Sequence, residues 1–332
     1  MCVFVLFKQK TDYIYSTQAV GNSNKKTKMS TVTEKHEAEM CYGGEADLHT
    51  RVTGCKKNPG HNGFIPLKNF NTNHLPRRYQ NDLMYETIQT LAALTVQIKT
   101  KFTSLERPEF YPGTQVPYPC YNDRGSHVMR LGTGRVCLAT KVSFDNFTCP
   151  CAKCLVSTTP SKVWGRVSVK TAMHVVFDHS EARKTSCVLG FDDNKSPGIS
   201  LDGWDIGYVN IMGDFCELRY WTCDLELVDE LQKKCDRFYD LCGEVRDRYR
   251  GLVDKIKLTV IVSHPHGCPK QVSVGQWTQK RERDGYKIRY WYTTCTCPGS
   301  SGACVYRPRH NLRSYNHPHS GSHFGLNYSA EW

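Results

Sequence analysis

Residues 162–177 read KVWGRVSVKTAMHVVF, and this stretch decides the fold class. Small or β-branched residues alternate with polar ones up to about residue 171, which is the pattern of a β-strand with one face toward a core. The stretch then turns apolar around a single histidine, His174. It therefore predicts a strand that leads directly into a candidate functional side chain.

The same strand-like sequence pattern continues on both sides of this segment, from about residue 125 onward. Segments of about 5–10 residues, rich in β-branched and aromatic side chains, are bounded by Gly, Asp, Asn or Pro. They lie within HVMRLGTGRVCLATKVSF (127–144), SCVLGF (186–191), GISLDGWDIGYVNI (198–211), DFCELRYWTC (214–223), KLTVIVSH (257–264), KQVSVGQW (270–277) and KIRYWYTTC (287–295). Many short strands joined by turns predict a mainly β protein, either a sandwich or a barrel.

Two segments show helical spacing of their apolar residues instead. Residues 80–103 form the first, with Asn81 or Asp82 as the cap of its first turn. The second covers about residues 225–255, with Asp224 as its N-cap and a glycine in the middle that should weaken or bend it. We therefore expect two helices in an otherwise β-rich chain.

The domain organisation follows from these patterns. Residues 1–75 are polar and keep no apolar period, so we expect an irregular N-terminal region. Residues 76–118 hold the first helix and a Pro-rich linker. Residues 119–332 form the β-rich domain, and the helix of about 225–255 is inserted in it.

Charge and hydropathy limit the partners of the 332-residue chain. Its formal net charge is +12, but the basic residues are scattered and not interleaved with aromatic ones, so a nucleic-acid partner is unlikely on this pattern. No apolar run approaches the ~18 residues of a membrane-spanning helix. The first residues lack the positive n-region and the long apolar run of a secretory signal. We therefore expect a cytoplasmic protein with no membrane partner.

The chain has 17 cysteines. An odd number without a secretory signal favours free thiols or a metal site over a disulfide framework. The densest cluster is Cys149, Cys151 and Cys154, three thiols within six residues. Thiols at such spacing are zinc ligands in many proteins, with a fourth ligand from elsewhere. A structural zinc ion and free thiols are the two interpretations of this cluster.

A second chemistry-bearing motif is TTCTCPGSSGACV at 293–305. Pro-Gly and Ser-Gly are turn dipeptides, but Gly-x-Ser-Gly also presents a serine beside backbone N–H groups. Acyl-bond hydrolysis by serine needs a base, a carboxylate that orients the base, and N–H groups that face the oxyanion. Ser301 is the candidate nucleophile, His174 the candidate base, and Gly299 and Ser301 the candidate oxyanion donors.

In chain order these motifs resemble those of the trypsin-like, chymotrypsin-fold serine peptidases. TAMHVV (171–176) resembles the family's Thr-Ala-x-His motif, and PGSSGACVY (298–306) its Gly-x-Ser-Gly motif. Gly132-Thr133-Gly134, HPHGCPKQVSVG (264–275) and YTTCTC (292–297) are closest in style to the intracellular HtrA-like branch, here without a PDZ module. The resemblance covers about residues 120–332. It implies two six-stranded antiparallel β-barrels and a serine endopeptidase that acts on protein or peptide substrates and requires no cofactor.

The resemblance also implies an aspartate between His174 and the inserted helix. Asp214 follows a turn glycine and opens a strand, as the family's aspartate does, and it is the predicted partner of His174. Asp224 and Asp205 are the alternatives. The chain departs from the digestive members at Ser300, where they carry Asp, which fits an enzyme that is not activated by a freed N-terminus.

The resemblance places the base of the primary pocket six residues before the nucleophile, at Cys295. The lack of an aspartate there argues against a Lys or Arg preference. The strand after the nucleophile offers His317, His319 or His323, and glutamyl-specific relatives bind Glu or Gln through such a histidine. We hypothesise acidic or amide specificity; the alternative is that these histidines lie in a solvated C-terminal loop.

Three other functions stay open at this point. Viral relatives use a cysteine nucleophile, although Cys297 lies four residues upstream of the expected position. The chain could instead be a catalytically inactive, peptidase-like binding module. It could also be a zinc-binding or nucleic-acid-binding protein built around the cluster of Cys149, Cys151 and Cys154. The oligomeric state does not follow from the sequence.

Overall fold

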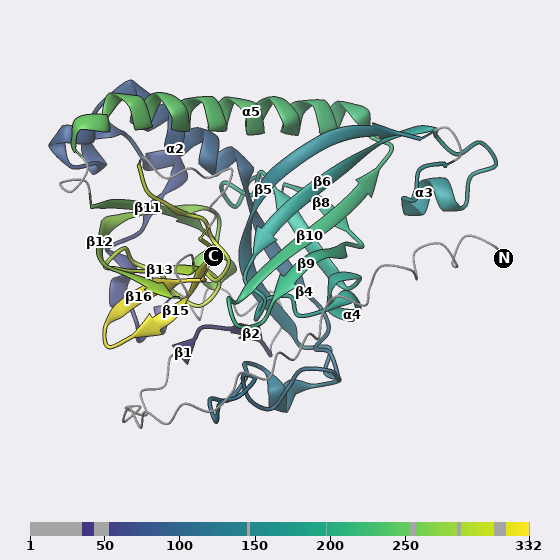
Figure 1. Ribbon diagram of the computed structural model, residues 1–332, viewed down its shortest axis with the longest axis horizontal. Helices are drawn as coiled ribbons and strands as arrows, with labels where there is room; N and C mark the ends of the chain where they lie inside the picture. The colour runs from purple at the N-terminus through teal and green to yellow at the C-terminus, as the bar shows by residue number, and fades with distance from the viewer. Residues whose placement is uncertain are drawn as a thin grey trace. The chain divides into compact units, whose positions relative to one another are not determined.

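Two antiparallel sheets form the centre of the structure (Figure 1). The computed structural model describes residues 35–42, 53–144, 147–196, 198–252, 257–283, 287–308 and 317–331. All of them belong to the unit Thr33–Trp332. The predicted irregular segment therefore falls partly outside the described residues.

The first sheet contains the strand that ends at His174. Its order is β8 (Ile199–Asp202), β7 (Thr185–Leu189), β4 (Thr95–Thr100), β5 (Met129–Ser143), β6 (Val163–Thr171), β10 (Phe215–Thr222) and β9 (Asp205–Asn210), and β2 (Glu39–Cys41) pairs with β5 outside this path. Strand β6 forms as predicted, but it is mostly buried on both faces, whereas its alternating pattern predicted one buried face.

The second sheet contains the strands on either side of the predicted nucleophile loop. Its order is β1 (Lys35–His36), β15 (His319–His323), β16 (Leu326–Ser329), β13 (Lys287–Tyr292), β12 (Gln271–Arg283), β11 (Leu258–Ser263) and β14 (Val305–Tyr306), and β3 (Ile65–Pro66) pairs with β12. The two curled antiparallel sheets confirm the predicted mainly β, chymotrypsin-like fold class. Each sheet has eight strands instead of the expected six; β1 and β3 from the N-terminal region add to the second sheet, and β2 adds to the first, which has seven strands without it.

The helices lie outside the sheets. Helix α5 (Leu225–Arg248) begins at Asp224, whose side chain accepts a hydrogen bond from Leu227 N at 3.0 Å, as predicted for its N-cap. It packs on α2 (Asp82–Leu94) and on strands β5 and β6, along one side of both sheets (Figure 1). The remaining helices are short: α3 (Ala152–Leu155), α4 (His179–Ala182), and the 3₁₀ helices η2 (Pro59–His61), η3 (Leu67–Asn69), η4 (Thr72–His74), η5 (Arg77–Tyr79), η6 (Tyr121–Asp123), η7 (Arg250–Leu252) and η8 (Pro265–Gly267). Among the described residues, no helix combines the length and the apolar character needed to span a bilayer.

The first predicted helix is correct only over its first half. The predicted segment 80–103 forms α2, but the chain then continues as strand β4. Strand β4 pairs with β5 on one side and β7 on the other, so its backbone hydrogen bonds are made in the sheet. Its TVQIKT sequence is rich in β-branched residues, which favour a pleated surface over a helix. The segment 76–118, which we expected to precede the β-rich domain, thus supplies a central strand to it.

A buried ion cluster fixes the turn that carries His174. Glu181 accepts hydrogen bonds from Arg107 Nε at 2.6 Å and from Arg130 Nη2 at 2.6 Å, and all three side chains are fully buried. The same guanidinium groups donate to the backbone carbonyls of His174 at 3.1 Å and of Val175 at 2.9 Å. The cluster therefore couples the stability of the fold to the position of the candidate base.

We expect Glu181→Gln to lower the free energy of unfolding by about 3–5 kcal/mol, because it leaves two guanidinium groups buried without a counter-charge. Burial alone would raise the pKa of Glu181, but Arg130 and Arg107 hold it at about 2, below its ordinary 4.5. The stabilisation is therefore fully present above pH 4.5 and is lost as the pH falls toward 2. Urea unfolding at pH 7 and at about pH 2.5, inside this window, tests this. Asp229→Asn, which breaks the exposed Lys141–Asp229 pair, is the control and should change stability by no more than about 1 kcal/mol.

Candidate active site

His174 and Asp214 meet at the junction of the two sheets. His174 follows strand β6, and its Nδ1 lies 2.8 Å from Asp214 Oδ2. The backbone N–H of His174 donates to Asp214 Oδ1 at 2.9 Å, so both carboxylate oxygens hold the same residue. The Oδ2 atom also accepts a hydrogen bond from Ser320 Oγ at 2.5 Å. This leaves Nε2 as the free ring nitrogen of His174; it is buried and has no hydrogen-bond partner among the described residues.

Electrostatics keep this pair in a catalytically useful state. Burial would raise the pKa of Asp214, but the neighbouring His174 and His36 side chains hold it well below its usual range. Burial lowers the pKa of the His174 imidazole, and the Asp214 carboxylate opposes this shift only in part. Asp214 is therefore an anion at neutral pH, and His174 is a neutral imidazole that can accept a proton at Nε2.

The two alternative aspartates lie elsewhere. Asp205 forms a hydrogen bond with Nδ1 of His179, and both side chains are about half exposed. Asp224 caps helix α5. Among the three candidates, Asp214 is the one that contacts His174.

The nucleophile loop is a tight turn that glycine makes sterically possible. Gly299 and Gly302 have φ angles of 92° and 87°, in the region that favours glycine. A Cβ atom on Gly302 would lie 2.1 Å from Thr171 Oγ1, and one on Gly299 would lie 2.6 Å from the carbonyl oxygen of His264. Among the described residues, the N–H groups of Gly299 and Ser301 have no backbone acceptor.

The Gly-Thr-Gly motif of strand β5 supports this loop. Thr133 N donates to the carbonyl of Ser301 at 2.8 Å, and Thr133 Oγ1 donates to the carbonyl of Gly299 at 2.8 Å. The carbonyl of Thr133 accepts from Thr171 Oγ1 at 2.8 Å, which ties the loop to the end of the strand before His174. A motif that drew attention only by resemblance thus connects the nucleophile loop to the histidine turn.

An N-terminal segment occupies the space in front of Ser301. Ser301 Oγ donates a hydrogen bond to the backbone carbonyl of Glu37 at 2.6 Å instead of to His174. The ring of the preceding residue, His36, lies 5.2 Å from the ring of His174, measured between centroids. Ser301 and His174 therefore both contact the same short stretch of chain.

The Glu37 side chain enters a polar pocket. Lys57 Nζ lies 2.5 Å and Ser322 Oγ 2.7 Å from Glu37 Oε1. His319 Nε2 lies 3.8 Å from Oε2, and neither of these two buried atoms has a hydrogen-bond partner among the described residues. Burial would raise the pKa of Glu37, but His319 and Lys57 lower it to about 2, so the pocket holds a carboxylate.

Of the four predicted pocket residues, His319 lies beside the Glu37 carboxylate. Cys295 instead packs against Gly63, where a Cβ atom would lie 2.3 Å from its sulfur. His317 is buried against Tyr290, and His323 lies against Phe324 at the turn between β15 and β16. Cys295, His317 and His323 were also predicted to line the pocket. Among the described residues, none of these three contacts the Glu37 carboxylate.

Sequence reasoning missed the residue that carries the pocket's positive charge. Lys57 Nζ is also held by Thr296 Oγ1 at 3.0 Å and by Asn327 Oδ1 at 2.9 Å. It belongs to the N-terminal region that we expected to be irregular, and its partners are more than 230 positions away in the sequence. No local pattern marks such a residue; the only available signal was the absence of an acidic residue at the pocket base.

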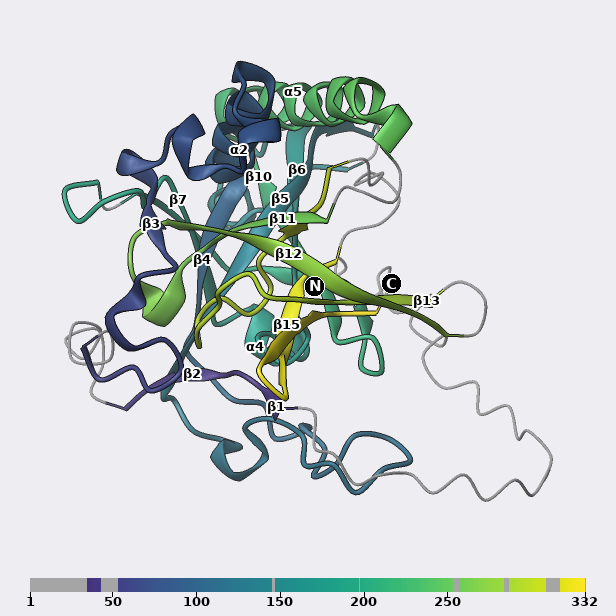
Figure 2. The same ribbon diagram turned by 90° about the vertical axis from the view of Figure 1, so that its left-hand side faces the viewer.

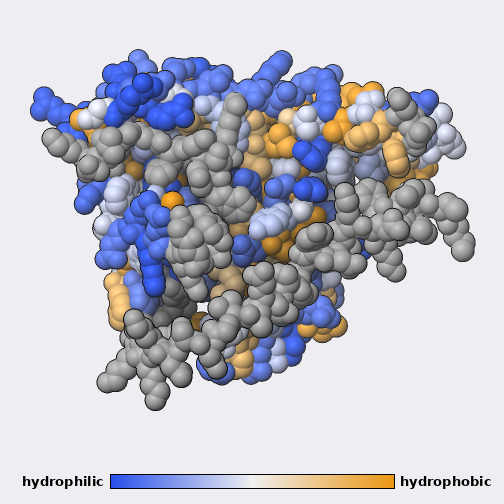
Figure 3. Space-filling view, in the orientation of Figure 1, coloured by the Kyte–Doolittle hydropathy of each residue, from blue (hydrophilic) through white to orange (hydrophobic). Residues whose placement is uncertain are grey.

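The predicted thiol cluster forms, and it gains a fourth member. The sulfur atoms of Cys149, Cys151 and Cys154 all lie within 4.8 Å of one another. Cys223, at the end of β10, brings its sulfur to 3.8 Å from that of Cys151. Burial raises the pKa of Cys149 to about 12; hydrogen bonds from the Cys154 backbone and the neighbouring thiols outweigh burial at Cys151 and lower its pKa to about 7. The cluster lies at α3, at one end of the β5–β6 hairpin, where hydrophobic side chains are exposed (Figure 3).

Comparisons with known proteins concern the fold. No family model matches the sequence, and curated proteins give no match either. Solved structures that the chain is similar to include the HtrA-type protease AlgW with tripeptide, at 12% identity and a TM-score of 0.38, over 74% of this chain and 58% of that one. They also include the Rv3671c protease from M. tuberculosis in its active form, at 11% identity and a TM-score of 0.37, over 74% and 78%.

The chain spans less than two thirds of the AlgW chain that it matches, at 58%. At these identities and scores the matches carry no argument about activity. Function therefore has to be argued from the site itself.

Proposed function

We propose that the chain is a serine endopeptidase that cleaves peptide bonds after acidic or amide side chains. The observations that carry the proposal are the buried His174–Asp214 hydrogen bond and the contact of Ser301 Oγ with a peptide carbonyl, that of Glu37, whose neighbour His36 lies against the His174 ring. The roles follow the chymotrypsin-type template. Ser301 attacks the carbonyl carbon, His174 accepts the proton at Nε2 and passes it to the leaving amine, and Asp214 orients the imidazole.

The N–H groups of Gly299 and Ser301 are proposed as the oxyanion hole. They flank the glycine turn at the nucleophile, and neither is used in a backbone hydrogen bond among the described residues. Donors that point at the developing oxyanion from a preorganised loop stabilise the tetrahedral intermediate, and one such donor is worth about 10²–10³ in turnover.

The P1 preference is proposed from the pocket contents. Lys57, Ser322 and His319 surround a carboxylate, and the pocket provides no described acidic residue for a Lys or Arg side chain. The substrate is therefore a protein or peptide with Glu, or the isosteric Gln, before the scissile bond.

The test of the proposed function is a panel of peptides that differ only at P1. We expect hydrolysis after Glu and Gln and none after Lys or Arg. A serine-directed phosphonate should label Ser301 and stop hydrolysis, whereas iodoacetamide should leave it intact, which separates a serine from a cysteine nucleophile. A Ser301→Ala chain that keeps every measured activity would instead favour an inactive binding module.

The charge of the pocket gives a sharper prediction. We expect Lys57→Met to lower kcat/KM for a Glu peptide about 10- to 100-fold, which is the usual size of a charged hydrogen bond, and to change a Gln peptide much less. Lys56→Met is the matched control, because the neighbouring Lys56 is exposed. Steady-state kinetics with the two peptides measure the difference; an equal loss for Glu and Gln peptides would contradict the assignment of Lys57 to the carboxylate.

A structural zinc ion at the thiol cluster is proposed as a second, independent property. The sulfur atoms of Cys149, Cys151 and Cys154 lie within 4.8 Å of one another, and Cys223, whose sulfur lies 3.8 Å from that of Cys151, would complete the four ligands of a closed structural zinc site. The ion would join the α3 loop to the end of β10 and would take no part in hydrolysis. Metal analysis after exhaustive dialysis should find zinc that is lost in Cys151→Ser, and zinc content that is unchanged by this substitution would contradict the site.

A further inference from the structure

Residues 35–41 cross the candidate active site as an extended peptide (Figure 2). Before the crossing point, Lys35 and His36 pair antiparallel with Ser322 and Gly321 of strand β15. After it, strand β2 pairs antiparallel with the start of β5, with Glu39 opposite Leu131. The segment thus leaves one sheet and joins the other, and the Glu37–Ala38 bond lies between the two pairings.

The side chains of this segment are accommodated as substrate side chains would be. The His36 ring stacks on Tyr111 at 5.1 Å between centroids and also lies against His174. The Glu37 carboxylate is in the pocket of Lys57, and the Glu37 carbonyl accepts from Ser301 Oγ. Glu39 forms a hydrogen bond with His266 Nδ1 at 2.8 Å on the far side of the bond. Every described residue from 36 to 39 is at least partly buried.

We infer that the chain cleaves its own peptide bond between Glu37 and Ala38; this inference rests on the proposed function and names its first substrate. For attack, the Glu37 carbonyl oxygen turns from Ser301 Oγ toward the N–H groups of Gly299 and Ser301, and the Ser301 hydroxyl turns toward His174 Nε2. Ser301 Oγ then bonds to the Glu37 carbonyl carbon while His174 takes the hydroxyl proton. The bond to the Ala38 nitrogen then breaks, and His174 delivers the proton to that nitrogen. Water next attacks the acyl group, giving one proton to His174 and leaving a Glu37 carboxylate, and Ser301 recovers its proton.

Cleavage has a regulatory consequence. As long as the segment is intact, His36 and Glu37 fill the places that another peptide would need, so the chain blocks its own site. After cleavage, the described residues before the cut, 35 to 37, are held by β1, a strand of two residues, by the contacts of His36 and by the pocket. Their release opens the site, whereas β2 keeps residues 39–41 in the first sheet. Hydrolysis of added peptides should therefore follow cleavage of the chain itself.

The test compares intact masses and N-terminal sequences of the purified full chain and three variants. We expect the parent chain to acquire a new N-terminus at Ala38, Ser301→Ala to stay uncut at this bond, and Glu37→Lys to stay uncut as well. Glu109→Lys is the matched control, because Glu109 is exposed, and it should be cut like the parent. The fraction cut should not change on 100-fold dilution, because the segment is already in the site.

The outcomes separate this inference from the function on which it rests. A parent chain that hydrolyses Glu peptides but keeps its own Glu37–Ala38 bond overturns self-cleavage and leaves the peptidase proposal standing. A cut at another bond, or an equal cut in Glu37→Lys, also overturns it. A chain that cuts neither itself nor any peptide of the panel refutes the proposed function.

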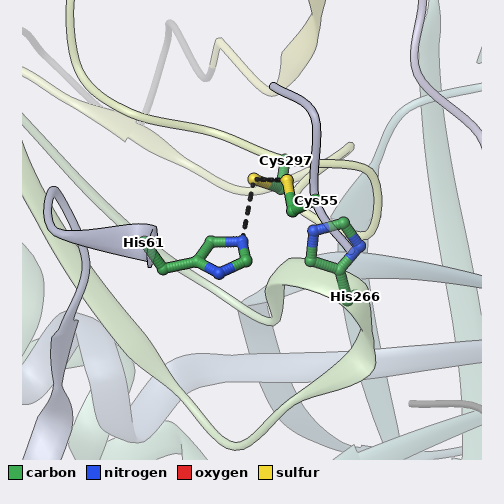
Figure 4. A group of neighbouring side chains, drawn as sticks. All are labelled: Cys55, His61, His266 and Cys297. Carbon is green, nitrogen blue, oxygen red and sulfur yellow. Dashed lines mark hydrogen bonds between the residues drawn. The ribbon is translucent and has the colours of Figure 1, made fainter. Parts of the chain in front are cut away.

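A second inference rests on different residues. Cys55, His61, His266 and Cys297 converge from three parts of the chain (Figure 4). Cys55 and His61 come from the N-terminal region, His266 from η8, and Cys297 from the nucleophile loop. One donor atom of each lies within 4.8 Å of the others.

The distances match a tetrahedral metal site. Zinc bound to sulfur at ~2.3 Å and to nitrogen at ~2.0–2.1 Å separates two sulfur ligands by about 3.8 Å and a sulfur from a nitrogen by about 3.5 Å. The sulfur atoms of Cys55 and Cys297 are 3.5 Å apart, and Cys297 Sγ is 3.5 Å from His61 Nε2. The sulfur separation is too long for a disulfide, whose bond length is about 2.05 Å.

The residues around these four side chains favour the binding of a cation. His266 Nδ1 is bonded to the Glu39 carboxylate, and its Nε2 is buried without a hydrogen-bond partner among the described residues. A carboxylate on the other ring nitrogen is the usual support of a metal-binding histidine. Asn58 donates to Cys55 Sγ through its backbone at 3.4 Å and to Cys297 Sγ through its side chain at 3.1 Å, which stabilises thiolates. Both histidines have positive φ, 50° at His61 and 52° at His266, a conformation kept only where the surroundings enforce it.

We propose that these four residues bind a zinc ion that is structural for the nucleophile loop. Cys297 stands four residues before Ser301, and the carbonyl of Pro298 accepts a hydrogen bond from His266 N at 2.7 Å. The ion would thus join the N-terminal region, η8 and the loop that carries Gly299 and Ser301. A cavity of about 410 Å³ lined in part by Cys55 and His266 gives chelators access to it.

The test measures the metal content and the Co²⁺ absorption of the full chain. Cys149, Cys151 and Cys154 are all replaced by serine in this chain, so that the other thiol cluster cannot bind metal. We expect about one zinc per chain, exchangeable for Co²⁺ with the visible bands of a tetrahedral site and the near-ultraviolet charge transfer of two thiolates. His61→Gln, a mild change at a partly exposed ligand, should weaken zinc binding at least tenfold, whereas His127→Gln, at an exposed histidine, should not.

Two results would overturn the zinc site. One is a zinc content that is the same after His61→Gln and Cys55→Ser in folded protein, as judged by circular dichroism. The other is a disulfide between Cys55 and Cys297 in the chain purified under reducing conditions with zinc present. Neither readout depends on peptidase activity, so the test stands whether or not the chain hydrolyses peptides.

Discussion

Replacing Ser301 by alanine is expected to lower kcat for a Glu peptide by about 10⁵–10⁶, the size of effect that loss of a nucleophilic serine has in other triad enzymes. Alanine removes the oxygen atom that forms the acyl bond, and the oxyanion donors alone recover only a small part of the rate. The measurement is single-turnover hydrolysis followed by mass spectrometry. Because Ser301→Ala keeps its own Glu37 in the pocket of Lys57 and Ser322, an added peptide should bind weakly to this variant.

The adjacent serine provides the matched control. Ser300 Oγ is buried and bonded to Ser263 Oγ at 3.1 Å, inside the second sheet. Ser300→Ala should therefore change kcat by less than about tenfold and act mainly through stability. If Ser300→Ala abolished hydrolysis and Ser301→Ala did not, the nucleophile would be the other serine of the motif.

Asp214→Asn is expected to lower kcat by about 10⁴, as the corresponding change does in the chymotrypsin-type template. Asp214 accepts hydrogen bonds from His174 Nδ1, from His174 N and from Ser320 Oγ. An amide nitrogen in place of Oδ2 would donate to Nδ1, so the tautomer would carry its proton on Nε2 and could not accept one from Ser301. The loss should be smaller at alkaline pH only if another base takes over, so a full pH profile is the measurement.

Asp205→Asn serves as its control. Asp205 binds His179, whose side chain is about half exposed, and it does not contact His174. The substitution should leave kcat within about threefold, because a surface ion pair contributes little. A large loss in Asp205→Asn with little loss in Asp214→Asn would contradict the assignment of the orienting carboxylate.

The sequence predicted those features of the fold and of the site that depend on residues close together in the chain. The alternation up to Thr171 predicted strand β6, and the turn glycine before Asp214 favoured this residue as the aspartate that the family resemblance implied, just before β10. The glycine spacing of the nucleophile loop follows from steric limits that act within a few residues. Such features could be read without knowing which strands pair.

Features that depend on distant pairings could not be read in this way. Strand β4 looked like the second half of a helix, because its position between β5 and β7 is fixed only by the sheet. Glu37 and Lys57 lie in a polar stretch without a pattern, and they reach the site because β1 and β2 each join a sheet at a strand far along the chain. Their role depends on the tertiary structure alone.

The choice among the C-terminal histidines shows a finer limit. His317, His319 and His323 are all odd-numbered, so strict alternation would place them on one face of a strand. The pairing of β15 with β16 shifts register between His319 and Gly321, and a β-bulge of this kind changes which face a side chain lies on. This bulge lies between His319 and His323, whereas His317 precedes β15 and packs against Tyr290; of the three, His319 is the one that lies beside the Glu37 carboxylate.

The most direct test of the central claim is incubation of the chain with a synthetic peptide of its own sequence, KHEAEM, flanked by neutral residues. The account predicts that the parent chain makes a single cut, between the first Glu and Ala, and that Ser301→Ala makes none. It also predicts no cut of the peptide in which Lys replaces this first Glu. The parent chain would contradict the account if it left the peptide intact, and so would Ser301→Ala if it cut the peptide at the same rate.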